Sequence, residues 1–389
     1  MRRLALATSM LFTLGAAAQA ADVIKLGNLT QLSGALATPG SETKRGIDLA
    51  LEELDNKLGG VPVKYYPVDD KSNPAEAING ASKLIDELKV DFVTGLGASN
   101  TLIPVFKSFV DANILAVGAL AGPRQYAGAE CNPNGFFVSF TNDDWPAAAG
   151  LYMTNQGYKR VFFLAADYQA GKEHVEAAIK YFKGQAVGPV YTPLSQLDFA
   201  PEIARIRAEK PDAVYSFLVG AGGIAFSKQY SQGGLMGQIP FVTEDPVANP
   251  LTFPAQGDAA LGIVMATNWH IGLDNAANKK FVGTFRAKYN RDPATFAALG
   301  YDAVKAIDGA VRGVNGDIEN KDALRASMRK ANFDSVRGKF KFNNNQFPIE
   351  DLFMMEVAKD ANGGLTSKLK EVVAKDWQDP LHTQCPMKW

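Results

Sequence analysis

The 389-residue sequence has few of the residues on which metal and redox centres depend. It contains two cysteines and three histidines, too few for a cysteine-rich zinc site or an iron–sulfur cluster. Its 40 Lys and Arg residues are balanced by 41 Asp and Glu residues, so no cationic surplus is available to neutralise a run of phosphates. We therefore expect no metal, no cofactor and no nucleic-acid partner.

The motifs of common hydrolases and nucleotide-binding enzymes are also missing. The sequence has no Gly-x-Ser-x-Gly elbow, no Gly-x-x-x-x-Gly-Lys-Ser/Thr loop and no His-Glu-x-x-His pair. His174 stands beside Glu173 and near Glu176 in a predicted helix, which is typical of a solvated face. No nucleophile stands in a recognisable setting near it. We therefore expect a binding protein and not an enzyme.

One uncharged apolar run stands out, at the N-terminus. Residues 4–18 are apolar apart from small hydroxyl side chains and follow Arg2-Arg3, and Ala18-Gln19-Ala20 has the small-x-small pattern of a signal peptidase site. The run is too short to span a bilayer comfortably, and no second run of about 18 apolar residues follows it. The sequence therefore predicts a signal peptide over residues 1–20, cleaved after Ala20, and export to the periplasm.

Short apolar runs alternate with helical patterns along most of the remaining chain. Predicted strands whose residues are apolar throughout indicate parallel sheets covered by helices on both faces. Two series of such units meet near Asp143-Asp144, and two helices (279–289 and 295–311) and a strand (351–358) follow them. If the helices complete the first unit and the strand completes the second, the chain crosses three times between them.

This pattern predicts an α/β protein with two doubly wound parallel-sheet lobes joined by three crossover hinge strands. The expected parts are lobe 1 (21–142 and 271–345), lobe 2 (143–270 and 346–375) and a C-terminal tail (376–389) that returns to lobe 1. Among the expected helices are residues 41–58, 74–88 and 101–112.

The two cysteines are expected to form a disulfide. An even pair of cysteines in an oxidising compartment is more often bridged than free. Cys131 lies in a stretch rich in Pro and Gly, and Cys385 lies in the tail, so the bridge would tie the tail to lobe 1. Two buried free thiols are the alternative.

Polar residues follow predicted strands in both lobes, where ligands of open α/β sheets bind. Gly97-Ala98-Ser99-Asn100-Thr101 leads from a strand into a helix. Its backbone N–H groups and hydroxyl suit a carboxylate, and an ordinary helix cap fits the same residues equally well. Asp245, next to Glu244, follows a strand of lobe 2 and could face Ser99 across a cleft.

Segments spread along the chain carry a family resemblance. They include Leu32-Ser33-Gly34, Arg45-Gly46-Ile47-Asp48, Asp69-Asp70-Lys71-Ser72, Lys210-Pro211-Asp212-Ala213 and Gly300-Tyr301-Asp302-Ala303. In this order they resemble the periplasmic branched-chain (Leu/Ile/Val) amino-acid-binding proteins over essentially the whole chain after residue 20. The resemblance implies a type I periplasmic-binding fold, an inner-membrane ABC importer as partner, and ligand capture by cleft closure.

The resemblance also implies which residues contact the ligand. Ser99 takes the carboxylate-binding position, with Asn100 beside it, and Asp245 is the nearest match to the acid that pairs with an ammonium group. The other implied contacts are Pro39, Leu120, Ala121, Gly122, Tyr168, Ala170, Val219 and Phe296. Gly122 replaces a Thr of the amino-acid binders, and Pro39, Ala170 and Val219 stand where aromatic residues are common.

Together these features favour a hydrophobic or branched-chain amino acid as ligand, because Ser99 and Asp245 suit a zwitterion. The replaced Thr and aromatic residues keep aromatic carboxylates of the benzoate or cinnamate type as an alternative. A periplasmic sensor with the same fold is a further alternative. We expect a monomer that binds a small molecule and serves a permease.

Overall fold

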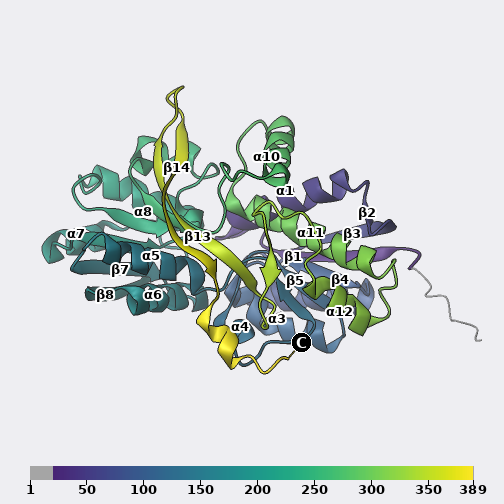
Figure 1. Ribbon diagram of the computed structural model, residues 1–389. Helices are drawn as coiled ribbons and strands as arrows, with labels where there is room; N and C mark the ends of the chain where they lie inside the picture. Colours follow the sequence, from purple (N-terminus) through teal and green to yellow (C-terminus); the bar gives the residue numbers. More distant parts are fainter. Residues whose placement is uncertain (1–20, 389) are drawn as a thin grey trace, which may run out of the picture.

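The computed structural model describes residues 21–388, so the expected signal peptide lies outside the described residues. Two lobes lie side by side, each built on its own sheet (Figure 1). The expected two-lobe α/β architecture is thereby confirmed. Within residues 21–388, no helix has both the length and the apolar content needed to cross a membrane.

The first sheet has the strand order β2-β3-β1-β4-β5-β6, and its strands are parallel except for the short hairpin strand β2. The strands are β1 (Ile24–Thr30), β2 (Lys57–Leu58), β3 (Val61–Asp69), β4 (Phe92–Gly95), β5 (Leu115–Gly118) and β6 (Gly135–Phe137). The helices are α1 (Ala37–Glu53), α2 (Pro74–Ser82) with a π turn (Lys83–Glu87), α3 (Ser99–Asp111), α4 (Arg124–Ala127), α10 (Ala276–Tyr289), α11 (Thr295–Gly313) and α12 (Lys321–Arg329). Side chains of α10, α11 and α12 share one apolar core with β1, β4 and β5, so these late helices pack on the first sheet.

The second sheet has the order β12-β13-β11-β10-β9-β7-β8, with β14 paired to β13. The strands are β7 (Arg160–Ala166), β8 (Gln185–Thr192), β9 (Ala213–Phe217), β10 (Phe241–Glu244), β11 (Val264–Thr267), β12 (Lys341–Phe342), β13 (Pro348–Lys359) and β14 (Leu365–Trp377). The helices are α5 (Asp144–Asn155), α6 (Gln169–Tyr181), α7 (Ala200–Glu209), α8 (Gly220–Gln232) and α9 (Phe253–Gln256), with 3₁₀ turns η2 (Asp245–Val247), η3 (Gly257–Ala260) and η4 (Pro380–Gln384). β12, β13 and β14 pair antiparallel at one edge of this sheet, and its other strands are parallel, as in the predicted doubly wound lobes.

The long β13–β14 hairpin was missed because its second strand is polar. Most residues of β14 are exposed or half-buried, so the sequence offers no continuous apolar run there. In Figure 1 this hairpin is the yellow ribbon along the second lobe, and its base leads to the C-terminal tail.

Several expected helix boundaries are wrong by one turn. The first helix ends at Glu53 instead of residue 58, because Asp55 and Asn56 adopt positive φ angles of 52° and 54° and turn the chain into β2. It also begins four residues early, at Ala37. By contrast, α2 begins as predicted at Pro74, where the side chain of Asn73 accepts N–H bonds from Ala75 and Glu76.

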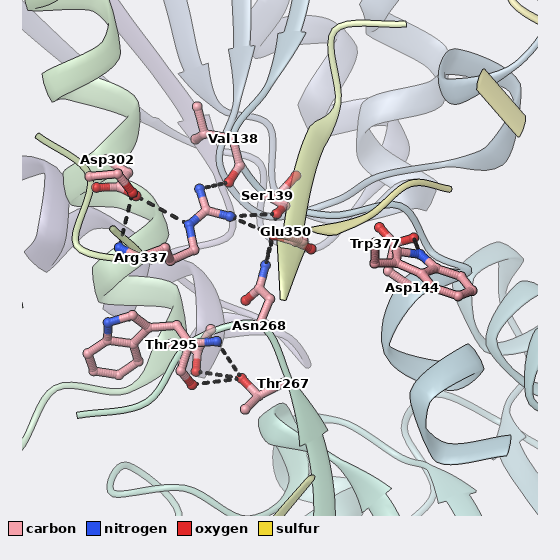
Figure 2. Close-up of polar contacts among 12 residues, drawn as sticks. Val138, Ser139, Asp144, Thr267, Asn268, Thr295, Asp302, Arg337, Glu350 and Trp377 are labelled. Atoms are coloured by element: carbon pink, nitrogen blue, oxygen red, sulfur yellow. Dashed lines mark hydrogen bonds and ion pairs between the residues drawn. The ribbon is translucent and has the colours of Figure 1, made fainter. Parts of the chain in front are cut away.

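The chain passes between the lobes three times: between β6 and α5, between β11 and α10, and between α12 and β13. A buried polar cluster joins these crossings (Figure 2). Asn268 of the second crossing donates to the Ser139 carbonyl of the first (3.0 Å) and to Oε2 of Glu350 in β13 (2.8 Å). Arg337 donates to the Val138 and Ser139 carbonyls and to Glu350. We call these residues, with Asp302, the hinge cluster.

The expected disulfide is confirmed. Cys131 and Cys385 are bridged, with their Cα atoms 5.7 Å apart. The bridge closes a sequence separation of 254 residues, and it fastens the tail that follows β14 beside α4 of the first lobe.

Candidate ligand-binding site

A cavity lies between the two lobes and is lined by residues of both, which is a common setting for small-molecule sites. Residues that follow the carboxyl ends of six strands line it: Gln31 after β1, Ser99 after β4, Ala121 after β5, Tyr168 after β7, Val219 after β9 and Pro246 after β10. Parallel strands bring their carboxyl ends to one edge of a sheet, which is why segments so distant in sequence meet here.

Most of the predicted contacts are brought together in this cavity. Those that line it are Pro39, Ser99, Leu120, Ala121, Tyr168, Ala170, Val219 and Phe296. The first-lobe and second-lobe members stand on opposite sides of the boundary between the sheets, so a molecule in the cavity contacts both lobes.

Asn100 and Gly122 do not line the cavity. The side-chain amide of Asn100 donates to the Ser72 carbonyl instead (3.4 Å). A Cβ atom at Gly122 would lie 1.7 Å from the Phe140 carbonyl oxygen, so this glycine is needed where the first crossing packs against the loop after β5. The same close packing leaves no room for the Thr that the family resemblance implies at this position.

Asp245 also lies outside this cavity. It opens η2, and its carboxylate accepts from Nδ2 of Asn249 (3.3 Å). With Trp269 and Thr295 it lines a separate cavity. Burial raises the pKa of Asp245 to about 7, so near neutral pH this carboxyl is protonated and uncharged in a substantial fraction of the molecules.

Ser99 is the first residue of α3, and Ala98 occupies the N-cap position. The Ser99 hydroxyl oxygen accepts from Nδ2 of Asn142 (3.1 Å), which leaves its O–H free to donate. The first backbone N–H groups of an α-helix have no acceptor within the helix, and they carry its positive dipole end. This arrangement suits a carboxylate better than a plain helix cap, because the serine side chain does not serve as the cap.

His174 is buried, which corrects the expectation of a solvated face. The residue is 1% exposed, and Nδ1 lies 2.7 Å from Oε2 of Glu244. The other Glu244 oxygen accepts the hydroxyl of Tyr215. The imidazole stacks on Phe217, with ring centroids 3.7 Å apart. Glu244 thus holds the imidazole in a fixed orientation on the second-lobe wall of the cavity.

Sequence reasoning missed several other lining residues, chiefly Gln31, Phe140, Asn142, Trp145 and Phe217. Phe140 and Asn142 lie on the first crossing, where the alternating pattern gives no orientation. Trp145 has the apolar character of an ordinary core position. A signal for Gln31 did exist, since it directly follows β1 at the same sheet edge as Ser99.

Aromatic rings form much of the cavity wall. Phe140 stacks on Trp145 with centroids 3.8 Å apart, and Trp145 lies 6.0 Å from Phe296. None of the described residues that line the cavity is Lys, Arg, Asp or Glu. Within residues 21–388, no cluster of three or more His, Cys, Asp or Glu is placed to hold a metal ion. The lining therefore offers apolar and aromatic surfaces together with a few polar side chains, of which none is Lys, Arg, Asp or Glu.

Comparison with known proteins places this geometry in a family. The periplasmic binding protein family matches residues 23–363. The Leu/Ile/Val-binding protein homolog 6 of Brucella melitensis is 27% identical over 396 residues, which cover 99% of this chain and 100% of the relative.

Solved structures agree with this assignment. An ABC transporter solute-binding protein from R. palustris in complex with benzoate is 31% identical, covers 94% of this chain and 100% of its own, and has a TM-score of 0.88. The branched-chain amino acid substrate-binding protein LivJ from Streptococcus pneumoniae, in complex with isoleucine, shares the fold at 23% identity and a TM-score of 0.78, covering 90% of this chain and 99% of its own. These are substrate-binding proteins and not enzymes, as expected for this chain. The chain belongs to the periplasmic binding protein family.

Proposed function

We propose that this protein captures an aromatic carboxylate in the cavity between its lobes and delivers it to an ABC importer. One observation carries the choice of ligand: aromatic rings line the cavity, Ser99 stands in it at the start of α3, and no acidic side chain is among the described lining residues. A benzoate-like molecule supplies both a flat ring for the walls and a carboxylate for Ser99. The R. palustris relative, whose structure contains benzoate, supports this choice.

A hydrophobic amino acid, which the sequence resemblance favours, fits the cavity less well. Its ammonium group needs an anionic partner, because an unpaired charge is costly to bury. Asp245 was expected to supply this partner, but its carboxylate is held by Asn249 and faces a different cavity. Because some relatives are Leu/Ile/Val-binding proteins, amino acids are the alternative class of ligand, and the experiments must include them.

Closure of the cleft provides the mechanism. A ligand that contacts residues of both lobes, such as Ser99 and Tyr168, makes all its contacts only when the lobes are together. It therefore stabilises the closed state by its differential affinity for that state. The permease then recognises the closed arrangement. In this proposal the protein acts in the periplasm as a monomer.

A thermal-shift panel tests the ligand class. The protein is unfolded and refolded to remove any bound ligand, and its melting temperature is measured with 1 mM benzoate, 4-hydroxycinnamate, L-leucine or L-phenylalanine. A ligand of micromolar affinity at that concentration adds about 4 kcal/mol of stability, enough to raise the melting temperature by several degrees. We expect a shift with the aromatic acids only; a shift with the amino acids alone would overturn the proposal.

Replacing Ser99 tests where the carboxylate sits. Because a hydrogen bond to a charged group contributes about 1.5–3 kcal/mol, Ser99→Ala should weaken aromatic-acid binding at least about tenfold in calorimetry. Ser108→Ala, an exposed position near the other end of α3, is the matched control and should leave the affinity unchanged. Equal affinities for both variants would remove Ser99 from the site.

A further inference from the structure

Two residues that line the cavity carry buried N–H donors without acceptors. Nε2 of Gln31 and Nε1 of Trp145 have no hydrogen-bond partner among the described residues. Both side chains line the cavity, and both residues are fully buried at 0% exposure. A buried donor without a partner costs about 1–3 kcal/mol, and buried Trp N–H groups usually find an acceptor. A ligand in the cavity is the natural source of both missing acceptors.

The amide of Gln31 lies beside the loop that leads to Ser99. A Cβ atom at Gly97 would lie only 1.6 Å from Oε1 of Gln31, so the glycine lets this amide pack against the backbone two residues before Ser99. Oε1 accepts the hydroxyl of Thr30 (3.3 Å), which fixes the orientation of the amide and leaves its N–H groups for another partner. Gln31 thereby places its amide beside the loop that leads into α3.

Trp145 belongs to the other lobe. It is the second residue of α5, and its ring packs against both Phe140 and Phe296. The carboxylate of Asp144, the residue before it, accepts the indole N–H of Trp377 (2.8 Å). This neighbouring carboxylate is therefore not the acceptor of the Trp145 N–H. The Trp145 N–H is therefore a donor set into an aromatic wall.

We propose that Gln31 and Trp145 are specificity-determining residues that recognise two separate hydrogen-bond acceptors on the ligand. Gln31 donates to the carboxylate, and Trp145 donates to an oxygen substituent on the aromatic ring. The inference rests on the proposed function and narrows it from aromatic carboxylates to oxygen-substituted aromatic acids. One donor comes from each lobe, so both acceptors are bound together only in the closed state.

Isothermal titration calorimetry on the refolded protein tests the proposal with benzoate, 3-hydroxybenzoate and 4-hydroxybenzoate. We expect at least one hydroxy acid to bind about five- to tenfold more tightly than benzoate, the gain typical of one neutral hydrogen bond. Trp145→Phe should abolish this preference, because it lowers the affinity for the hydroxy acids by more than it lowers the affinity for benzoate. Trp377→Phe removes an indole N–H outside the cavity and should keep the preference.

The Gln31 variants test the carboxylate end. Gln31→Leu should weaken benzoate and the hydroxy acids alike, by about 10- to 100-fold, because the lost bond is to a charged group. Gln31→Glu keeps the size of the side chain but places a negative charge beside the ligand carboxylate, and it should weaken binding further. Unaltered binding by both variants would exclude Gln31 from ligand recognition.

The outcomes separate this proposal from the proposed function. If the wild-type protein binds none of the three acids, the proposed function fails. If it binds benzoate as tightly as both hydroxy acids, or if Trp145→Phe weakens all three equally, aromatic-acid capture stands and the ring-oxygen proposal is overturned. Melting curves of the ligand-free variants show that each one folds.

Discussion

Arg337 and Glu350 share a buried, charge-assisted hydrogen bond at the place where the chain crosses between the lobes. Nη1 of Arg337 donates to Oε2 of Glu350 over 2.8 Å, and only 5% and 4% of these side chains are exposed. The same oxygen of Glu350 also accepts from Asn268. Nε of Arg337 reaches Asp302 of α11 over 3.3 Å (Figure 2). One guanidinium therefore joins α11 of the first lobe to the first and third crossings, and Glu350 extends this network to Asn268 of the second.

Removing the guanidinium should destabilise the protein strongly. Arg337→Met removes the cation beside Asp302 and the hydrogen-bond donor of Glu350, and breaking a buried ion pair by removing one partner costs about 3–5 kcal/mol. Urea unfolding followed by circular dichroism measures this loss. Arg286→Met is the control, since Arg286 pairs with Asp292 on the surface and such pairs contribute at most about 1 kcal/mol. Equal effects of the two substitutions would show that the hinge cluster is not a stabilising element.

Glu350 should make stability depend on pH. Burial, opposed by Arg337 and Asn268, raises the pKa of Glu350 from 4.5 to about 8. Between these values the folded protein keeps a proton that the unfolded chain releases, so this contribution to stability is fully present below pH 4.5 and is lost as pH rises through 8. Glu350→Gln removes the dependence.

Melting temperatures from pH 4.5 to 8.5 measure the effect. The wild-type protein should lose stability relative to Glu350→Gln as pH rises across this range. Glu356→Gln, on the same strand but paired with Lys370 at the surface, should follow the wild-type curve. Parallel curves for wild type and Glu350→Gln would contradict the assigned pKa direction.

The sequence predicts the parts of this molecule that depend on local pattern. Ser99 was found because a strand, a small-residue loop and a helix follow one another in the sequence, and parallel strands must bring such loops to one edge. Cys131 and Cys385 were paired by counting. Neither inference needs to know how distant segments pack.

The rest depends on packing between distant segments. Glu173 and Glu176 beside His174 indicate a solvated face, yet Glu244 and Phe217, both from neighbouring strands, enclose the imidazole. The direction of the Asp245 side chain is likewise set by the η2 turn and its bond to Asn249. Such tertiary contacts leave no periodic trace in the sequence.

Reduction of the disulfide should destabilise the protein without weakening ligand binding. In the chain-entropy model a bridge across 254 residues contributes about 5 kcal/mol. The double variant Cys131→Ser/Cys385→Ser should therefore melt several degrees lower than the wild type. Its affinity for the ligand should remain the same, because neither cysteine lines the cavity. A large loss of affinity would show that the tail acts on the cleft.

Asp245→Asn separates the two ligand classes most directly. If the ligand is an aromatic carboxylate, the substitution should leave its affinity within about twofold, since Asp245 faces another cavity and bonds to Asn249. If the ligand is an amino acid whose ammonium pairs with Asp245, loss of the charge should weaken calorimetric binding more than tenfold, because removing one partner of a buried charge pair costs at least about 2 kcal/mol.

Stability supplies an independent check that the carboxyl is buried as described. Its pKa of about 7, raised from 3.8 by burial, means that its contribution is present below pH 3.8 and is lost as pH rises through 7. The wild-type melting temperature should therefore fall relative to that of Asp245→Asn between pH 4 and pH 7, whichever ligand the protein binds.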